Sequence, residues 1–143
     1  MKESALAEIT LRRYEEPHES GRELVKKICL SLGLLQEGDS RDVIVDILLV
    51  LLEAAKKKCW LNESEIKKKV ATMRTTGIAD SNIRRQLKRL RDLLLVEKNA
   101  NSYRISEFSS LSKLFKEKIQ DFLLPQIVKR VEEYLKKLEE EHR

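Results

Sequence analysis

The sequence has few of the residues that mark several large classes of protein. Only four glycines and two prolines occur in 143 residues, which excludes a collagen-like or linker-rich chain. Aromatic residues make up 5% of the chain, so the core has to be mainly aliphatic. The longest uninterrupted apolar run, residues 47–52, is far shorter than the ~20 residues that span a bilayer. Since no apolar signal segment opens the chain either, we expect a cytoplasmic protein with no membrane association.

Residues that ligate metals or perform catalysis are also sparse. Cys29 and Cys59 lie thirty positions apart in apolar surroundings, so both are predicted to be core thiols without a disulfide. His18 and His142 lie near opposite ends, and no zinc-ligand spacing is present. A Gly-rich phosphate loop, a Ser/His/Asp set and an HExxH motif are all missing. We therefore expect no metal, no cofactor and no enzymatic activity.

Positive charge is concentrated in the middle of the chain. Lys and Arg total 29 and Asp and Glu total 24, a net charge of +5. Residues 62–104 contain eleven basic and five acidic side chains, net +6, whereas the two flanking segments are close to neutral. A localised basic surface is typical of nucleic-acid-binding proteins, although ordinary helices also expose Lys and Arg to solvent.

Periodic apolar positions predict a mainly α protein. Ser20 and Glu23 form a capping-box motif before a short amphipathic helix that ends at Gly33. Ser40 is the predicted N-cap of the next helix, residues 41–58, whose middle is apolar around nearly its whole circumference. Such a helix must be covered on several sides, for which a short chain can need a second subunit. Because the segment is rich in β-branched residues, a strand is the alternative.

Two further helices and a β-hairpin follow. Asn62 is the predicted cap of a helix that reaches about Arg74, and Asp80 or Ser81 caps the next one. The apolar stripe of that second helix consists of Ile83, Leu87, Leu90 and Leu94. Residues 95–98 and 103–105 have the composition of strands around a turn at 99–102. Trp60, in a short extended segment before these helices, is predicted to anchor the core.

Residues 109–142 are predicted to be helical again. Pro125 lacks a backbone donor, so it should kink or split this helix. After Pro125, apolar residues recur at the 4-3-4 spacing of a heptad seam. We expect the extension to pair across a two-fold axis, the alternative being that it folds back on its own subunit. The predicted dimer interface comprises Leu111, Phe115, Ile119, Phe122, Ile127, Val131, Tyr134 and Leu138.

The order of elements from 41 to 105 resembles that of the winged helix-turn-helix regulators of bacteria and archaea. Residues 81–90, SNIRRQLKRL, resemble their recognition helix, and residues 94–98 with 103–105 resemble the exit strand and wing. More narrowly, the chain is similar to a small archaeal winged-helix family of unassigned role. Two features depart from the pattern: the run Leu93–Leu95 stands where a glycine is usual after the recognition helix, and residues 75–79 are longer than the simplest turn.

The resemblance implies a mainly α fold with a winged helix-turn-helix core at 41–106. The apolar periodicity outside this core predicts an N-terminal arm and helix at 1–40 and C-terminal dimerisation helices at 107–143. The expected function is that of a sequence-specific, double-stranded-DNA-binding transcriptional regulator that acts as a homodimer, without an evident small-molecule effector. The alternatives are a winged-helix protein–protein interaction module in a larger assembly and an RNA-binding protein.

The basic face of the helix at residues 81–90 carries the expected contacts to DNA. If its leucines face inward, Arg84 and Arg85 can reach base edges, while Lys88 and Arg89 can bind phosphates. Short side chains at its positive N-terminal end allow close approach of the backbone. The full predicted set is Ser81, Asn82, Arg84, Arg85, Lys88 and Arg89 from the helix, with Lys98, Asn99, Asn101 and Arg104 from the hairpin.

Overall fold

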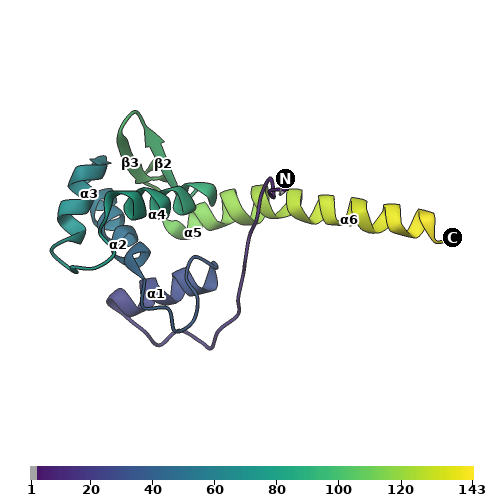
Figure 1. Cartoon of the computed structure of the whole chain (residues 1–143), viewed down its shortest axis with the longest axis horizontal. Coiled ribbons are helices and arrows are strands. Elements are labelled where there is room, and N and C mark those ends of the chain that lie inside the picture. Colours follow the sequence, from purple (N-terminus) through teal and green to yellow (C-terminus); the bar gives the residue numbers. More distant parts are fainter. Residues whose placement is uncertain (1–2) are drawn as a thin grey trace.

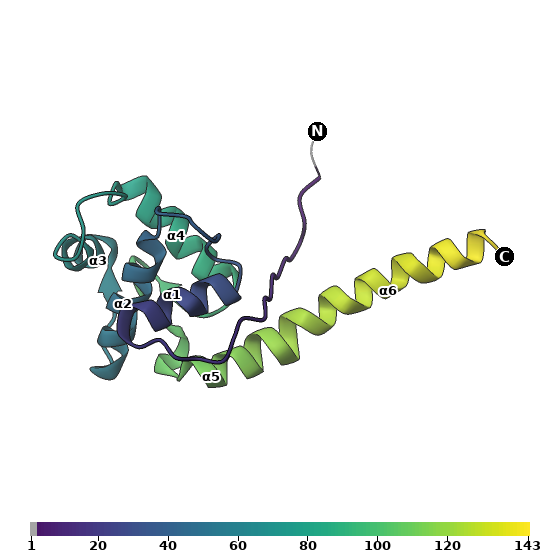
Figure 2. The same cartoon turned by 90° about the horizontal axis from the view of Figure 1, so that it is seen from below.

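A computed structural model describes residues 3–143 of the chain. It shows a mainly helical domain with a small three-stranded antiparallel sheet, from which a long C-terminal helix projects (Figures 1 and 2). None of the helices in residues 3–143 combines the length and the apolar character needed to cross a lipid bilayer.

The apolar helix at the centre of the domain is α2 (Val43–Lys56). It contacts α1 (Gly21–Ser31), α3 (Glu63–Val70), α4 (Asp80–Asp92) and the sheet. Its buried residues are Val43, Ile44, Val45, Asp46, Ile47, Leu48, Val50, Leu51 and Ala54. The helix is therefore covered by its own chain, and neither a second subunit nor the alternative strand is needed to explain its composition.

The sheet consists of β1 (Leu61–Asn62), β2 (Val96–Asn99) and β3 (Ser102–Ile105), in the order β1-β3-β2. β2 and β3 form the predicted hairpin, with Lys98 opposite Tyr103. Ala100 and Asn101 make the turn, where Ala100 adopts φ 54°. Tyr103 and Ile105 alternate with half-exposed neighbours, so one face of β3 packs on the core and the other remains accessible.

Only one of the predicted helix N-caps is present. Asn62 and Glu65 form a capping box in which the Glu65 N–H donates to Asn62 Oδ1 at 2.8 Å. Ser20 makes no capping hydrogen bond, since α1 begins at Gly21 with φ 58°. The N-cap of α2 is Asp42 rather than Ser40, and that of α4 is Ala79 rather than Asp80 or Ser81. α3 also ends at Val70, several residues before Arg74, which leaves Met73 49% exposed.

The C-terminal helix continues through Pro125, so the predicted split there is wrong. α5 (Leu111–Leu114) leads through π-helical turns, η2 (Phe115–Leu123), into α6 (Leu124–Glu141) as one rod (Figure 2). Leu123 and Leu124 keep helical dihedral angles on the N-terminal side of Pro125. The wider turns of η2 change the hydrogen-bond pattern just before the proline, where a normal α-helix would lose a bond.

The N-terminal residues run as an extended arm across the end of α1. The Arg12 guanidinium donates to the carbonyls of Leu30 at 2.8 Å and Leu35 at 3.0 Å. Gly33, with φ 71°, lies against Thr10, and a Cβ added at Gly33 would come within 2.4 Å of the Thr10 Cβ. The two cysteines are both free, but only Cys29 is buried, where burial raises its pKa to about 12. Cys59 is exposed, so its prediction as a core thiol is wrong.

Candidate nucleic-acid interface

α4 buries one face and exposes a basic one. Ile83, Leu87 and Leu90 are all fully buried, which confirms the predicted orientation of the helix. The spacing of these residues, four and then three, places them on a single stripe. Consequently Ser81, Arg84, Arg85 and Lys88 lie on the outer side, and each is exposed.

Ion pairs on the surface accompany several of these cations. Arg84 Nε lies 2.8 Å from Glu63 Oε1, and Lys88 Nζ lies 3.1 Å from Asp92 Oδ2. The Arg84 side chain is nevertheless 59% exposed and that of Lys88 is 70% exposed. Exposed pairs of this kind contribute about 0–1 kcal/mol, so either cation can exchange its carboxylate for a phosphate at little cost.

Asn82 and Arg89 contact the chain itself rather than pointing outward. Asn82 Nδ2 donates to the Gly77 carbonyl at 2.8 Å, and its Oδ1 accepts from Arg85 Nη2 at 2.6 Å. Arg89 donates to Gln86 Oε1 at 2.9 Å and reaches the Gly33 carbonyl at 3.4 Å. Both side chains are half-buried, so they fix the turn before α4 and the packing of α1 beside it.

The hairpin extends the accessible surface beside α4 (Figure 1). Lys98, Asn99 and Asn101 are exposed at or near its tip. Lys98 Nζ lies 5.5 Å from the centroid of the Tyr103 ring, an arrangement that leaves the ammonium group open to solvent. These three residues and the outer face of α4 are the part of the predicted set that remains free to contact a ligand.

Arg104 belongs to the base of the hairpin instead. Its guanidinium carbon lies 4.4 Å from the Trp60 ring centroid and 4.6 Å from that of Phe108. Arg104 also donates to Glu97 Oε1 at 2.6 Å, and its side chain is only 23% exposed. The guanidinium group of Arg104 is therefore engaged within the hairpin base, and the predicted DNA contact at Arg104 is not supported. Trp60 is a half-buried stacking partner of Arg104, and the prediction that it anchors the core is wrong.

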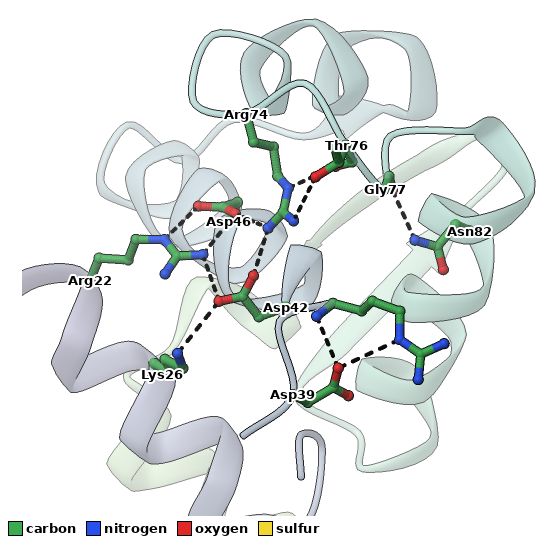
Figure 3. A network of polar contacts seen from close by, with 10 residues as sticks. Arg22, Lys26, Asp39, Asp42, Asp46, Arg74, Thr76, Gly77 and Asn82 are labelled. Carbon is green, nitrogen blue, oxygen red and sulfur yellow. Dashed lines mark hydrogen bonds and ion pairs between the residues drawn. The ribbon is translucent and has the colours of Figure 1, made fainter. Parts of the chain in front are cut away.

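Four residues missed at the sequence level hold the approach to α4 in place (Figure 3). This ion cluster consists of Arg22 from α1, Asp42 and Asp46 at the start of α2, and Arg74 from the turn after α3. Arg22 Nε donates to Asp46 Oδ1 at 2.9 Å, and Arg74 Nη1 donates to both carboxylates at 2.9 Å. Lys26 lies 3.7 Å from Asp42 at the edge of the cluster.

The ion cluster also fixes the turn that enters α4. Arg74 Nε donates to the Thr76 carbonyl at 2.8 Å, close to where Asn82 binds Gly77. Burial alone would raise the pKa of Asp46, but hydrogen bonds and charge from Arg22 and Arg74 outweigh it and hold that pKa below its usual value. The same balance lowers the pKa of Asp42. A single carboxylate within an apolar run, such as Asp46 in residues 43–52, is the sequence signal that points to buried partners.

A polar groove of about 530 Å³ lies between α4 and the loop before α2. Arg41, Arg85 and Arg89 line it, and the Arg41 side chain is 92% exposed. Asp39 lies 3.6 Å from Arg41 and offsets part of its charge. Arg41 thus adds a cation next to the α4 surface that the sequence analysis did not include.

The predicted dimer residues divide into two groups. Ile119 is fully buried in the chain's own core, and Leu111 packs against that core. Phe115 is half-buried beside α1, so these three residues serve the subunit itself. The remaining residues are accessible: Phe122 is 52% exposed, Val131 52%, Tyr134 70% and Leu138 53%, with Ile127 half-buried.

Comparisons with known proteins add no relative from which a role can be transferred. No family model matches the sequence, and neither a curated protein nor a solved structure matches it. Within residues 3–143, no group of three or more His, Cys, Asp and Glu side chains is placed to hold a metal ion. The function therefore has to be argued from the basic surface.

Proposed function

We propose that the protein is a sequence-specific, double-stranded-DNA-binding transcriptional regulator that acts as a homodimer in the cytoplasm. In this proposal the domain is a winged helix-turn-helix in which α4 is the recognition helix and the β2–β3 hairpin is the wing. The observation that carries it is the orientation of α4, since three fully buried residues hold its basic face outward.

The chemistry of that face suits the major groove of B-form DNA. A guanidinium group can donate two hydrogen bonds to O6 and N7 of guanine, so Arg84 and Arg85 are assigned to base edges. Ser81 is small and exposed near the start of α4, which permits close approach to the duplex. Lys88 is assigned to a phosphate on the same side of the helix.

The residues beside α4 supply the contacts to the DNA backbone. Lys98, Asn99 and Asn101 are assigned to phosphates or to the adjacent groove from the hairpin, and Arg41 to a phosphate from the opposite side. Asn82 and Arg89 hold the helix in position through their contacts within the chain. A two-fold dimer would repeat all these contacts ~34–36 Å away and bind a near-palindromic site.

A fluorescence-anisotropy titration tests the proposal. It compares a mixed-sequence duplex with a duplex that has been selected for binding to the protein. Replacing both arginines, Arg84→Ala with Arg85→Ala, should weaken binding to the selected duplex at least about 30-fold, since each bidentate contact contributes about 1–3 kcal/mol. Circular dichroism and thermal melting should be unchanged because both side chains are exposed. The matched control, Lys129→Ala with Lys136→Ala, removes the same charge from α6 and should leave the affinity unaltered.

Salt dependence and competition separate the alternatives. Affinity for duplex DNA should fall steeply between two salt concentrations because counterions are released from the phosphates. Preferential binding of a structured RNA would favour the RNA-binding alternative. If no nucleic acid binds at low salt, an acidic protein partner becomes the better candidate, since the ion pairs of Arg84 and Lys88 show that this face already accepts carboxylates.

A further inference from the structure

α6 is an amphipathic helix with nothing packed on its apolar face. None of its residues is buried, and beyond η2 it makes no substantial contact with the rest of residues 3–143. The α6 stripe consists of Ile127, Val128, Val131, Tyr134, Leu135 and Leu138. Most of the stability of helices in proteins comes from the packing of an amphipathic face, and a contiguous exposed apolar surface marks an interface. We propose that a second copy of this chain covers the α6 stripe, with the two α6 helices parallel and in register.

The stripe is long and straight enough to pair with itself. At 100° per residue its members fall within about 120° of the helix circumference. Val128, Val131, Leu135 and Leu138 are separated by three, four and three residues, the spacing of a heptad seam. Val128 and Leu135 widen the seam that Ile127, Val131, Tyr134 and Leu138 already form, and they are 45% and 53% exposed.

Opposite charges border the two edges of the stripe. Arg130 and Lys137, seven residues apart, lie along one edge, and Glu132 and Glu139, also seven apart, lie along the other. Arg130 contacts Glu133 of its own helix at 3.4 Å through Nε, which leaves its other N–H groups for a partner. Each α6 therefore has a basic edge and an acidic edge between residues 130 and 139.

This arrangement of charge selects the direction of pairing. In a parallel two-fold pair, the basic edge of one helix faces the acidic edge of the other on both sides. The opposed charges are then about 3 Å apart along the axis, because Arg130 and Glu132 differ by two residues. In an antiparallel pair, like edges face each other and like charges repel. Glu141, in the last turn on the basic edge, is the one residue of unfavourable sign in the parallel pair.

Parallel pairing also affects the DNA-binding surface proposed above. This inference rests on the proposed function, in which the protein acts as a homodimer. Parallel pairing places both domains at the same end of the α6 pair. An antiparallel pair would instead separate them by the length of α6, which is about 27 Å for 18 residues, in addition to their own width. Two α4 helices that are to enter successive major grooves on one face of DNA have to be neighbours.

Disulfide cross-linking of the full chain distinguishes the two directions. Leu124 and Leu138 lie seven residues before and after Val131, so both are on the side of the α6 stripe. In a Cys59→Ser background, which leaves only the buried Cys29, Leu138→Cys and Leu124→Cys are each introduced alone. In the parallel pair each residue faces its own copy within disulfide reach, so both single variants should oxidise to covalent dimers. Lys136→Cys, on the opposite side of α6, is the control and should remain monomeric on a denaturing gel.

The other outcomes overturn the inference in recognisable ways. Cross-linking only when the Leu124→Cys and Leu138→Cys chains are mixed would establish an antiparallel pair. The absence of every cross-link would show that a different partner covers the stripe. DNA binding is measured on the same Cys59→Ser chain, so its retention without cross-linking would count against the pairing alone. Its loss with cross-linking intact would count against the proposed function alone.

Charge reversal tests the edges directly. Arg130→Glu with Lys137→Glu makes both edges acidic and should raise the dimer dissociation constant at least tenfold in sedimentation-velocity runs. Mixing that chain with Glu132→Lys, Glu139→Lys should restore dimers of the wild-type strength. The matched control, Lys129→Glu with Lys136→Glu, changes the same charge away from the stripe, and an equal loss of dimer there would refute the role of the edges.

Discussion

α4 and α6 share an amphipathic pattern, but the apolar stripe is buried in α4 and exposed in α6. Both are amphipathic helices with charged residues outside an aliphatic stripe. In α4 the stripe residues Ile83, Leu87 and Leu90 are fully buried by the chain. In α6 the corresponding residues, Val131, Leu135 and Leu138, remain 52–53% exposed. Periodicity shows which side chains share a face, but only the arrangement of the other elements determines whether that face is covered.

The difference follows from where the two helices lie. α4 contacts α2, α3 and β2, so its apolar side is enclosed by the domain core and its basic side is held in one orientation. α6 leaves the domain after η2 and continues away from it (Figure 1). A rigidly mounted basic face suits recognition of an ordered ligand, whereas an uncovered apolar face suits association with another chain.

The largest expected effect compares one leucine from each helix. Leu87→Ala should lower the free energy of unfolding by about 3 kcal/mol, because it leaves a cavity at a fully buried site. Leu135→Ala should leave the stability of the monomer unchanged and weaken the dimer. Urea unfolding at a protein concentration below the dimer dissociation constant measures the first effect, and sedimentation the second. Equal losses of monomer stability would mean that α6 folds against the domain.

The ion cluster is the next feature to test, since it fixes the turn that enters α4. Arg74→Met should cost about 3 kcal/mol at neutral pH, because it leaves Asp42 and Asp46 with too little positive charge in a mostly buried site. Both Asp pKa values lie below their usual range in the folded protein. The stabilisation that the pair provides is therefore complete above the unfolded pKa of about 3.9 and is lost as the pH falls below it.

That pH dependence provides the control for the Arg74→Met variant. The difference in unfolding free energy between wild type and variant should be largest at pH 7 and should narrow by pH 3. Urea titrations at both pH values measure it. A difference that stays constant with pH would show that Arg74 stabilises the turn through its bond to Thr76 and its packing, rather than through the carboxylates.

The hairpin offers a smaller comparison, between a cation held by the fold and a free one. Arg104→Ala should lower the unfolding free energy by about 1–2 kcal/mol, because it removes a cation that lies over the rings of Trp60 and Phe108. Lys98→Ala should leave stability unchanged and weaken binding to all duplexes to a similar degree. Thermal melting and anisotropy on both variants separate the roles. A larger loss of affinity from Arg104→Ala at constant stability would return Arg104 to the binding surface.

Local patterns predicted much of this fold. The hairpin around Ala100 and Asn101, the Asn62 N-cap and the inward face of α4 all depend on residues within one or two turns of each other. The composition of such short segments is enough to define them. The orientation of Arg84 and Arg85 follows from the same short-range pattern.

Two of the errors occur where a distant residue competes with a local motif. Asp42 rather than Ser40 stands at the start of α2, and its carboxylate binds Arg74, thirty-two positions away, instead of capping the helix. Arg104 has the composition of a wing cation but stacks on Trp60, which comes before α3. Partners so far apart in sequence have no fixed spacing, so no periodicity could have identified them.

The smallest expected effect concerns the exit from α4, where Leu94 adopts a backbone conformation that favours glycine. Leu94 adopts φ 62°, between Leu93 and Leu95, whose side chains are 6% and 2% exposed. The left-handed conformation lets the chain leave α4 while both neighbours point into the core, at a cost of about 1–3 kcal/mol for a residue with a Cβ. Leu94→Gly should therefore raise the free energy of unfolding by about 1 kcal/mol, the extra flexibility of glycine offsetting part of the gain.

The matched change, Leu95→Gly, should destabilise the protein by more than 2 kcal/mol because it empties a buried site. Urea unfolding of both variants measures this, and a loss of stability in Leu94→Gly would show that the contacts of the half-buried Leu94 side chain outweigh its backbone strain.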